Sequence, residues 1–168
     1  MKGGDAVGQI VPSDAVGILD SVAIVATRWH VDVVDALIAG AREAIISRGI
    51  AETAVPVLYV PGAFELPLGV QTVLQRYRIE QQLKGNFHYA VIAIGCIIRG
   101  ETPHFHYIAR STTDALMQLA LKHHVPIGFG VLTTETREQA LARASQMNNK
   151  GREAAEAVLA MAKMMANQ

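Results

Sequence analysis

The sequence predicts an α/β fold in which helices cover both faces of a four-stranded parallel sheet, giving three layers. Short apolar segments, most of them rich in β-branched residues, lie at 21–27, 54–60, 89–95 and 127–132. They have the pattern of strands that are buried on both faces. Between these segments, apolar residues recur at spacings of three and four, the periodicity of amphipathic helices. Strands that alternate with helices form a parallel sheet, so ligand sites are expected beyond the carboxyl ends of the strands.

The expected helices have start and stop signals of their own. The first carries acidic residues in its first turn and closes at Arg48-Gly49. Pro61-Gly62 ends the second strand, in which Pro56 predicts an edge position in the sheet. Thr136 and Gln139 form a capping box that opens a further helix. Helices are therefore expected at 31–48, at 66–82, at 105–122, from position 136 onward and at 150–166, with a loop at 96–103.

Length and composition indicate one oligomeric domain. Of the 168 residues, 18% are charged and 51% are apolar, whereas soluble domains usually carry about 25% charged residues. This low charge content predicts that the chain buries more surface than a monomer of its size offers, and hence an oligomer. Residues 18–168 are interpreted as a single domain. Residues 1–17 have no clear period and are interpreted as an N-terminal arm or a disordered tail.

Charge and cysteine content exclude several classes of protein. The 15 basic residues balance the 15 acidic ones, which argues against a nucleic-acid binder and against a polybasic membrane anchor. A single cysteine, Cys96, excludes an intrachain disulfide framework and a Cys-rich zinc site. The apolar stretch at 89–98 is half the ~20 residues of a membrane span, and the N-terminus lacks the pattern of a signal peptide. We therefore expect a cytoplasmic protein with no nucleic-acid or membrane partner.

The ends of the first two strands each carry one residue with two interpretations. Trp29 follows the first strand and is either a core or interface anchor or a platform that stacks on a planar ligand. Glu65 lies where the second helix begins. It either complements that helix N-terminus or accepts hydrogen bonds from a polyol or an amine. Spacing alone does not decide between these interpretations.

The end of the third strand carries the strongest functional signal. Gly100 and Thr102 lie between a strand and a helix, where backbone N–H groups and a hydroxyl can bind an anion. His104 lies at the mouth of this site and could transfer protons near neutral pH. Two alternatives are weaker. His104 with His106 could bind a metal, but positions two apart on a helix diverge. Cys96 with His104 could be a nucleophile and its base, but no third member orients them.

The end of the fourth strand is followed by a late concentration of positive charge. These charges belong to Arg143, Lys150 and Arg152, which could form a solvated helix face. Alternatively, Arg143 and Lys150 could be the counter-charges of an anion bound after the third strand.

Four motifs together resemble the 6,7-dimethyl-8-ribityllumazine synthase family, over about residues 22–162. They are VPGAFELP at 60–67, IGCIIRGETPHFHYIA at 94–109, FGVLTTET at 129–136 and NKG at 149–151. The resemblance implies a flavodoxin-like fold, a pentameric ring and sites between adjacent subunits. It also implies a transferase that condenses 5-amino-6-(ribitylamino)uracil with 3,4-dihydroxy-2-butanone 4-phosphate, releasing phosphate and water. Such chemistry needs proton transfer and stabilisation of a leaving phosphate, but no redox cofactor and no metal.

The resemblance also implies a role for each candidate residue. Trp29 would stack on the pyrimidine, Glu65 would bind the ribityl chain or its neighbouring nitrogen, and His104 would be the catalytic acid and base. The remaining substrate-binding residues fall into three groups. Those expected to line the substrate are Ala63, Phe64, Cys96, Ile97 and Ile98; those expected to hold the phosphate are Gly100, Glu101, Thr102 and Arg143; those expected to come from the neighbouring subunit are Phe129, Lys150 and Glu153.

Three departures from the family pattern, at residues 29–30, at residue 106 and in the segment 144–149, affect these expectations. Trp29 replaces the commoner phenylalanine and His30 the commoner asparagine, while His106 stands where an acidic residue is usual. The wider indole predicts that riboflavin binds as well. The segment 144–149 is about one residue shorter than in many relatives, which leaves pentamer, decamer and icosahedral shell open. The alternative functions are a non-catalytic flavin- or lumazine-binding module on the same fold and a metal-dependent hydrolase.

Overall fold

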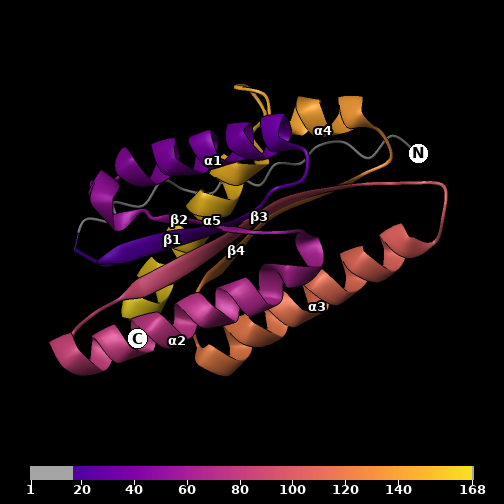
Figure 1. Cartoon of the computed structure of the whole chain (residues 1–168). Coiled ribbons are helices and arrows are strands. Elements are labelled where there is room, and N and C mark those ends of the chain that lie inside the picture. The colour runs from indigo at the N-terminus through magenta and orange to yellow at the C-terminus, as the bar shows by residue number, and fades with distance from the viewer. Residues whose placement is uncertain (1–16, 168) are drawn as a thin grey trace.

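The computed structural model describes residues 17–167. The predicted arm, 1–17, therefore lies outside the described residues, except for Gly17. Figure 1 shows the alternation of strands and helices along the chain. The elements are β1 Ser21–Thr27, α1 Val31–Ile46, η1 Glu52–Ala54, β2 Val57–Val60, η2 Ala63–Glu65, α2 Leu66–Lys84, β3 Tyr89–Ile98, α3 His104–His123, β4 Ile127–Thr134, α4 Arg137–Arg143 and α5 Lys150–Ala166.

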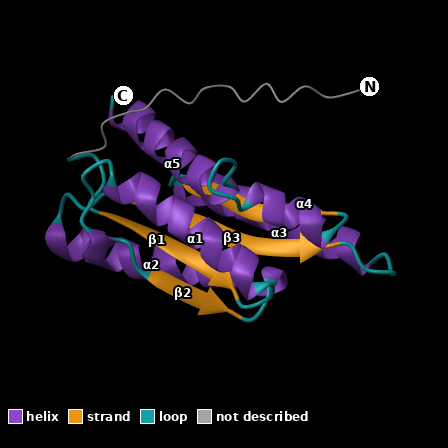
Figure 2. Ribbon diagram, turned by 90° about the horizontal axis from the view of Figure 1, so that it is seen from above, coloured by secondary structure: helices purple, strands orange, loops and turns teal. Residues whose placement is uncertain are grey.

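The sheet has four parallel strands in the order β2-β1-β3-β4, which is the order of flavodoxin-like folds. The predicted fold class is therefore confirmed. The strands lie side by side with their carboxyl ends at the same edge of the sheet (Figure 2). β1 and β3 are central, and β2 and β4 form the two edges. The edge position predicted from Pro56 is confirmed by this order, although Pro56 directly precedes β2 and does not belong to it.

Helices cover both faces of the sheet, as predicted, because successive side chains of a strand point to opposite faces. Val22, Ile24 and Ala26 of β1 pack into a core with α1, α4 and α5. Ala23 and Val25 of the same strand pack into a second core with α2 and α3. The three layers are visible in Figure 1, with α1 and α4 above the sheet and α2 and α3 below it. No helix within residues 17–167 is long and apolar enough to span a membrane.

Several element boundaries differ from the expected ones, for reasons of pairing. β3 continues to Ile98, so residues 96–98, expected in a loop, belong to a strand. They remain extended because β4 also runs further than expected and pairs Ile97 with Thr133 and Ile98 with Thr134. β2 is shorter than expected, since it pairs with β1 from Val57 onward. Residue 54 lies instead in the 3₁₀ turn η1, and the first helix ends at residue 46.

The capping box is confirmed in part. The hydroxyl of Thr136 caps α4 by accepting from the backbone N–H of Gln139 at 3.3 Å. The return bond is displaced by one residue, because the side chain of Gln139 accepts from the N–H of Glu135 at 2.9 Å. This geometry still satisfies two backbone donors at the start of α4.

The close approach of α5 to α1 fixes the start of α5. A Cβ atom at Gly151 would lie 2.0 Å from the carbonyl oxygen of Leu37, so only glycine fits at this crossing. Asn149 caps α5 by accepting from the N–H of Arg152 at 3.0 Å, and it donates to the carbonyl of Ala36 on α1 at 2.8 Å. The NKG motif thus locks α5 onto α1 and sets where its first side chains point.

Candidate active site

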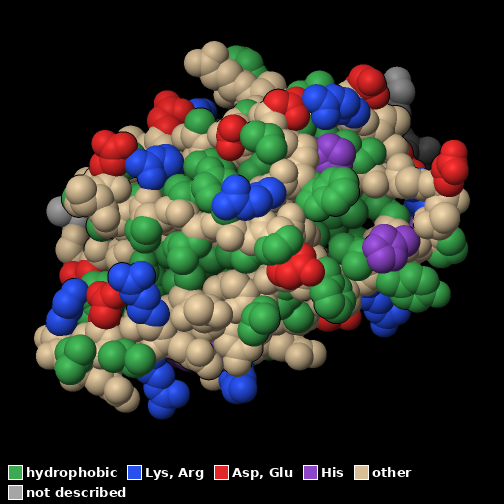
Figure 3. Space-filling view, in the orientation of Figure 1, with side chains coloured by type: hydrophobic (Ala, Val, Ile, Leu, Met, Phe, Trp, Pro, Cys, Tyr) green, Lys and Arg blue, Asp and Glu red, His purple; other side chains and the backbone are tan. Residues whose placement is uncertain are grey.

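A hollow of about 420 Å³ lies at the carboxyl ends of β1, β2 and β3, where the fold predicts a ligand site. We call it the strand-end hollow. In Figure 3, histidine and hydrophobic side chains meet around a recess at this end of the molecule. It is lined by Trp29, His30, Gly62, Ala63, Phe64, Glu65, Cys96, Ile97, Ile98, Gly100, Thr102, His104, Phe105 and Ile108.

Trp29 is presented to this hollow by the sharp turn between β1 and α1. His30, with φ 53° and ψ 54°, adopts the left-handed conformation, and α1 begins at the next residue. The indole remains 68% exposed. A large aromatic ring exposed to this extent is available for stacking on a planar ligand. The structure therefore favours a ligand platform over a core anchor within this chain.

Gly62 allows Trp29 and Glu65 to border the same space. A Cβ atom at position 62 would lie 3.2 Å from the Glu65 carboxylate and 3.6 Å from the Trp29 indole. Glu65 ends the turn η2, which is tied to α3 because the Thr112 hydroxyl donates to the Ala63 carbonyl at 3.0 Å. An aromatic face and a carboxylate are thus held side by side. This pair suits a flat heterocycle that carries N–H or O–H donors.

The third side of the hollow is the end of β3 with the following loop, residues 99–103. Cys96 is buried, whereas Ile97 and Ile98 are half-buried, and all three line the hollow. His104 is the first residue of α3, whose N-terminus has no side-chain cap. The backbone amides at an uncapped helix N-terminus generally favour an anion, and here the amide of His106 already donates to the Pro103 carbonyl at 3.0 Å. An imidazole therefore stands at an uncapped helix N-terminus, where the sequence predicts an anion site.

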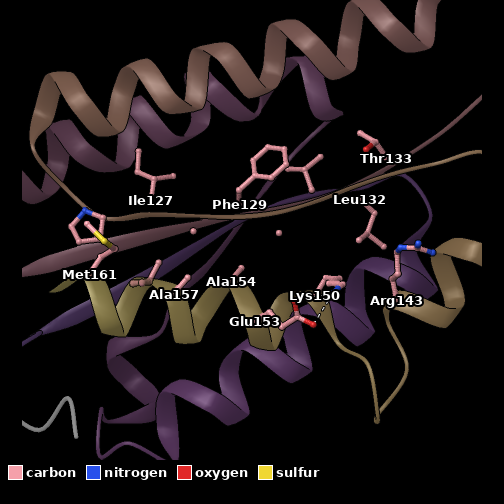
Figure 4. A pocket seen from close by; sticks show the side chains of 15 residues that line it. Ile127, Phe129, Leu132, Thr133, Arg143, Lys150, Glu153, Ala154, Ala157 and Met161 are labelled. Carbon is pink, nitrogen blue, oxygen red and sulfur yellow. Dashed lines mark hydrogen bonds and ion pairs between the residues drawn. The ribbon is translucent and has the colours of Figure 1, made fainter. Parts of the chain in front are cut away.

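A second hollow, of about 580 Å³, runs along the open edge of β4, and we call it the β4-edge hollow. Figure 4 shows it between β4, the end of α4 and α5. Arg143, Lys150 and Glu153 lie on the helix side, while Phe129 projects from the opposite face of the strand and is 44% exposed. Its lining comprises residues 126–133, Arg143, Lys150, Glu153, Ala154, Ala157, Val158 and Met161.

The charges of this hollow are not equivalent. The Lys150 ammonium lies 2.8 Å from both carboxylate oxygens of Glu153, so the two charges neutralise each other. The Arg143 guanidinium donates to the backbone carbonyl of Gln139 at 3.1 Å. Among the ion pairs of residues 17–167, none involves Arg143. Its charge is therefore free to meet an anion.

No residue lines both hollows, so one chain does not bring all the predicted residues together. Arg143, which the resemblance groups with the loop at 99–103, lies in the β4-edge hollow with Phe129, Lys150 and Glu153. Glu101 is exposed and lines neither hollow. The other predicted residues line the strand-end hollow.

The metal alternative finds no support in the geometry. The Nε2 atom of His106 lies 3.0 Å from Nη1 of Arg99, so a guanidinium, a group that repels cations, occupies that nitrogen. Within residues 17–167, no three His, Cys, Asp or Glu side chains gather as a metal site would require.

Comparison with known proteins identifies the family. The family model of 6,7-dimethyl-8-ribityllumazine synthase matches residues 20–166. The chain belongs to this family. A 6,7-dimethyl-8-ribityllumazine synthase of Kineococcus radiotolerans is 45% identical over 139 residues, which are 83% of this chain and 79% of the relative. The synthase of Xanthomonas campestris pv. campestris strain B100 is 41% identical over 143 residues, 84% of this chain and 87% of the relative.

Four residues that line the strand-end hollow of this lumazine synthase family member were not among the predicted site residues: His30, Gly62, Phe105 and Ile108. Phe105 and Ile108 also line the strand-end hollow, from the first turns of α3. Their spacing of three puts them on one face of the helix. Apolar residues at helical spacing usually belong to the hydrophobic core. Only the position of these two in the first turns of the helix that begins at His104 could have indicated a ligand contact.

Burial keeps Cys96 in its thiol form. Loss of hydration raises the pKa of this thiol from 9.0 to about 11; the Asp32 carboxylate adds to the rise and Arg137 opposes it. A raised pKa disfavours the thiolate, which is the nucleophilic form. The alternative of a Cys96 nucleophile is therefore not supported.

We expect native Cys96 to react with Ellman's reagent at pH 8 roughly 100-fold more slowly than the urea-unfolded chain, in which a cysteine has an ordinary pKa. The native rate should rise about tenfold for each pH unit up to 11, as the thiolate fraction grows. The single cysteine makes the absorbance signal unambiguous. Rapid native labelling at pH 8 would contradict the raised pKa and restore the nucleophile alternative.

Proposed function

We propose that this chain catalyses the condensation of 5-amino-6-(ribitylamino)uracil with 3,4-dihydroxy-2-butanone 4-phosphate, forming 6,7-dimethyl-8-ribityllumazine and releasing phosphate and water. Its membership of the family supports this reaction. The observation that carries the proposal is the strand-end hollow, where Trp29, Glu65 and His104 converge beside the uncapped N-terminus of α3. These groups are a stacking face, a hydrogen-bond acceptor, a proton carrier and an anion site.

The reaction joins an amine to a ketone, expels phosphate and closes a ring. The amine attacks the ketone carbonyl and water leaves, the C–O bond to phosphate then breaks, and the ribitylamino nitrogen closes the ring with loss of a second water. His104 accepts and returns the protons of these steps. Trp29 holds the pyrimidine flat and Glu65 accepts a hydrogen bond from its ribityl chain or the nearby nitrogen. Ala63, Phe64 and residues 96–98 shape the pocket around the substrate. No electrons are gained or lost overall, so the reaction requires no redox cofactor, and the proposed steps assign no role to a metal.

The phosphate is proposed to bind at Gly100, Glu101 and Thr102, with the uncapped amides of α3 and the Arg143 guanidinium as counter-charges. The free charge of Arg143 supports this role, whereas the charge of Lys150 is matched by Glu153. Because Arg143 lies in the other hollow, the proposal requires the β4-edge hollow of one subunit to face the strand-end hollow of the next. Phe129, Lys150 and Glu153 would then complete the neighbour's site.

We propose a ring of five subunits in the cytoplasm. The division of the predicted site between two hollows supports an assembly in which they meet, and the family resemblance supports five subunits. The exposed apolar side chains of the β4 region and α3, including Phe129, Tyr107 and Met117, would be covered by such contacts. The connection between α4 and α5 is the segment on which further assembly of rings into a decamer or a shell depends.

His104→Ala should lower kcat by about 100- to 10,000-fold, the usual contribution of a general acid–base group, while KM for both substrates changes little. The formation of the lumazine can be followed by its absorbance and fluorescence. Wild-type protein without turnover would refute the proposed reaction. A variant with unchanged kcat would remove His104 from the mechanism.

A mixture of His104→Ala and Arg143→Ala subunits, unfolded together and refolded, should recover activity that neither variant has alone. If one site takes His104 from one subunit and Arg143 from its neighbour, random mixing gives about one quarter of sites with both residues intact. Turnover after mixing measures the recovery, with each variant refolded alone as control. No recovery, or sedimentation of active protein as an 18.1 kDa monomer, would contradict the shared site.

Riboflavin is proposed as a second ligand of the strand-end hollow, because it extends the lumazine skeleton by a fused ring and Trp29 offers a wide face. Binding should quench the fluorescence of both Trp29 and the flavin, and Trp29→Phe should weaken it by a factor of a few to about ten. The matched measurement is the affinity of the substrate pyrimidine, which should change less. Equal weakening of both ligands would contradict the proposal.

A further inference from the structure

Arg99 is the first residue after β3, and its side chain joins three separate parts of the fold. Its Nε–H donates to the carboxylate of Glu135, which follows β4. Its Nη1 lies 3.0 Å from Nε2 of His106 in the first turn of α3. The guanidinium also lies over the ring of Phe105, 5.0 Å from the centroid. The backbone N–H of Arg99 donates to the carbonyl of Thr134 at 2.9 Å.

The contact between Arg99 and His106 has a defined direction. A guanidinium carries donors and no acceptor, so Nε2 of His106 must accept. The residue that stands in place of the family's usual acidic group thus accepts from Arg99, and Glu135 supplies the carboxylate that the structure describes in contact with this guanidinium.

These contacts close the loop at 99–103 into a ring. The loop starts at Arg99 and ends where α3 begins, and the Arg99 side chain spans it to Phe105 and His106. The loop has little packing of its own, since Glu101 and Thr102 are exposed and nothing lies within 4 Å of a Cβ atom built on Gly100. It projects beyond the end of the sheet (Figure 1, right). Its position therefore depends on the contacts at its two ends.

Arg99 itself lines neither hollow. We propose that Arg99 is a positioning residue, which holds the loop at 99–103 and the first turn of α3 so that they can bind the phosphate-bearing substrate. It acts through Glu135 and His106 and does not touch the substrate. The inference rests on the proposed function, because it assigns the loop to the phosphate of that reaction.

The role of Glu135 separates positioning from direct binding. If Arg99 bound the phosphate directly, Glu135 would compete for the guanidinium, and its removal would leave binding unchanged or improve it. If Arg99 positions the loop, Glu135 anchors the guanidinium to the end of β4, and its removal weakens binding. The two roles therefore predict opposite effects of the same substitution.

Steady-state kinetics with both substrates test the proposal. Arg99→Ala and Glu135→Gln should each raise KM for 3,4-dihydroxy-2-butanone 4-phosphate about tenfold, because small misplacements of binding groups are costly. KM for the aminouracil should stay within about twofold, since Trp29 and Glu65 are held by other elements. The double variant should be no worse than either single variant, as for residues that act as one unit.

Conservative variants provide the matched comparison. His106→Gln keeps an acceptor within reach of Arg99 and should retain a KM close to that of the wild type, whereas His106→Ala should raise it. Arg99→Lys keeps the charge but lacks the planar fork that reaches Glu135 and His106 together, so it should rescue only part of the effect.

Arg42→Ala is the control for simple loss of an arginine ion pair. Arg42 binds Glu52 at 2.7 Å and donates to the Val55 carbonyl at 2.7 Å, before β2 and away from both hollows. It should leave both KM values unchanged. The Arg99–Glu135 pair is solvent-exposed and adds little to stability, so the unfolding temperature of each variant should stay within about 4 °C of the wild type.

Three results would overturn the inference. They are wild-type kinetics for Arg99→Ala, an unchanged or lower KM for the phosphate-bearing substrate in Glu135→Gln, and an equal rise of both KM values with a lower unfolding temperature. The second result would make Arg99 a direct phosphate ligand, and the third would make it a general structural residue. A wild-type protein without turnover would instead refute the proposed function, and this inference with it.

Discussion

The parallel pairing of β3 with β4 is the contact on which both hollows depend. It runs from Val91 and Ile127 to Ile98 and Thr134, and the main-chain bond from Arg99 to Thr134 extends it by one residue. This long ladder holds residues 96–98 extended at the strand-end hollow. It uses one edge of β4 and leaves the other edge open, where the β4-edge hollow lies. The same ladder delivers Glu135 to the side of Arg99.

The layers and the parallel sheet could be predicted because burial on both faces leaves a direct pattern in the sequence. A strand such as 89–95 needs apolar residues at every position, and helices repeat theirs at three and four. The end of β3 could not be predicted in this way. Whether Cys96, Ile97 and Ile98 are strand or loop depends on how far β4 reaches, and periodicity within one segment carries no information about its partner's length.

The candidate site, like the fold, could be predicted only in part. Topology places Trp29, Glu65 and His104 at the same end of the sheet, so their convergence follows from the fold. The separation of Arg143 from the loop at 99–103 could not be predicted from the fold. The order of elements along the chain does not determine on which side of an edge strand a helix end lies. The cluster around Arg99 was missed for the same reason, since its partners come from β4 and α3.

The two arginines that the proposals link to phosphate binding differ in whether their charge is paired. Arg99 is bound by the carboxylate of Glu135 and has little charge left for a ligand, but its three partners give it a fixed position. Arg143 donates to a backbone carbonyl, which orients the guanidinium without neutralising it.

A paired charge suits a group that must hold a loop still, because the group is pre-organised before substrate arrives. An unpaired charge suits a group that must attract and release a phosphate, because no internal carboxylate competes with the ligand. Placing these tasks on two residues lets the loop stay in position whether or not the phosphate is present.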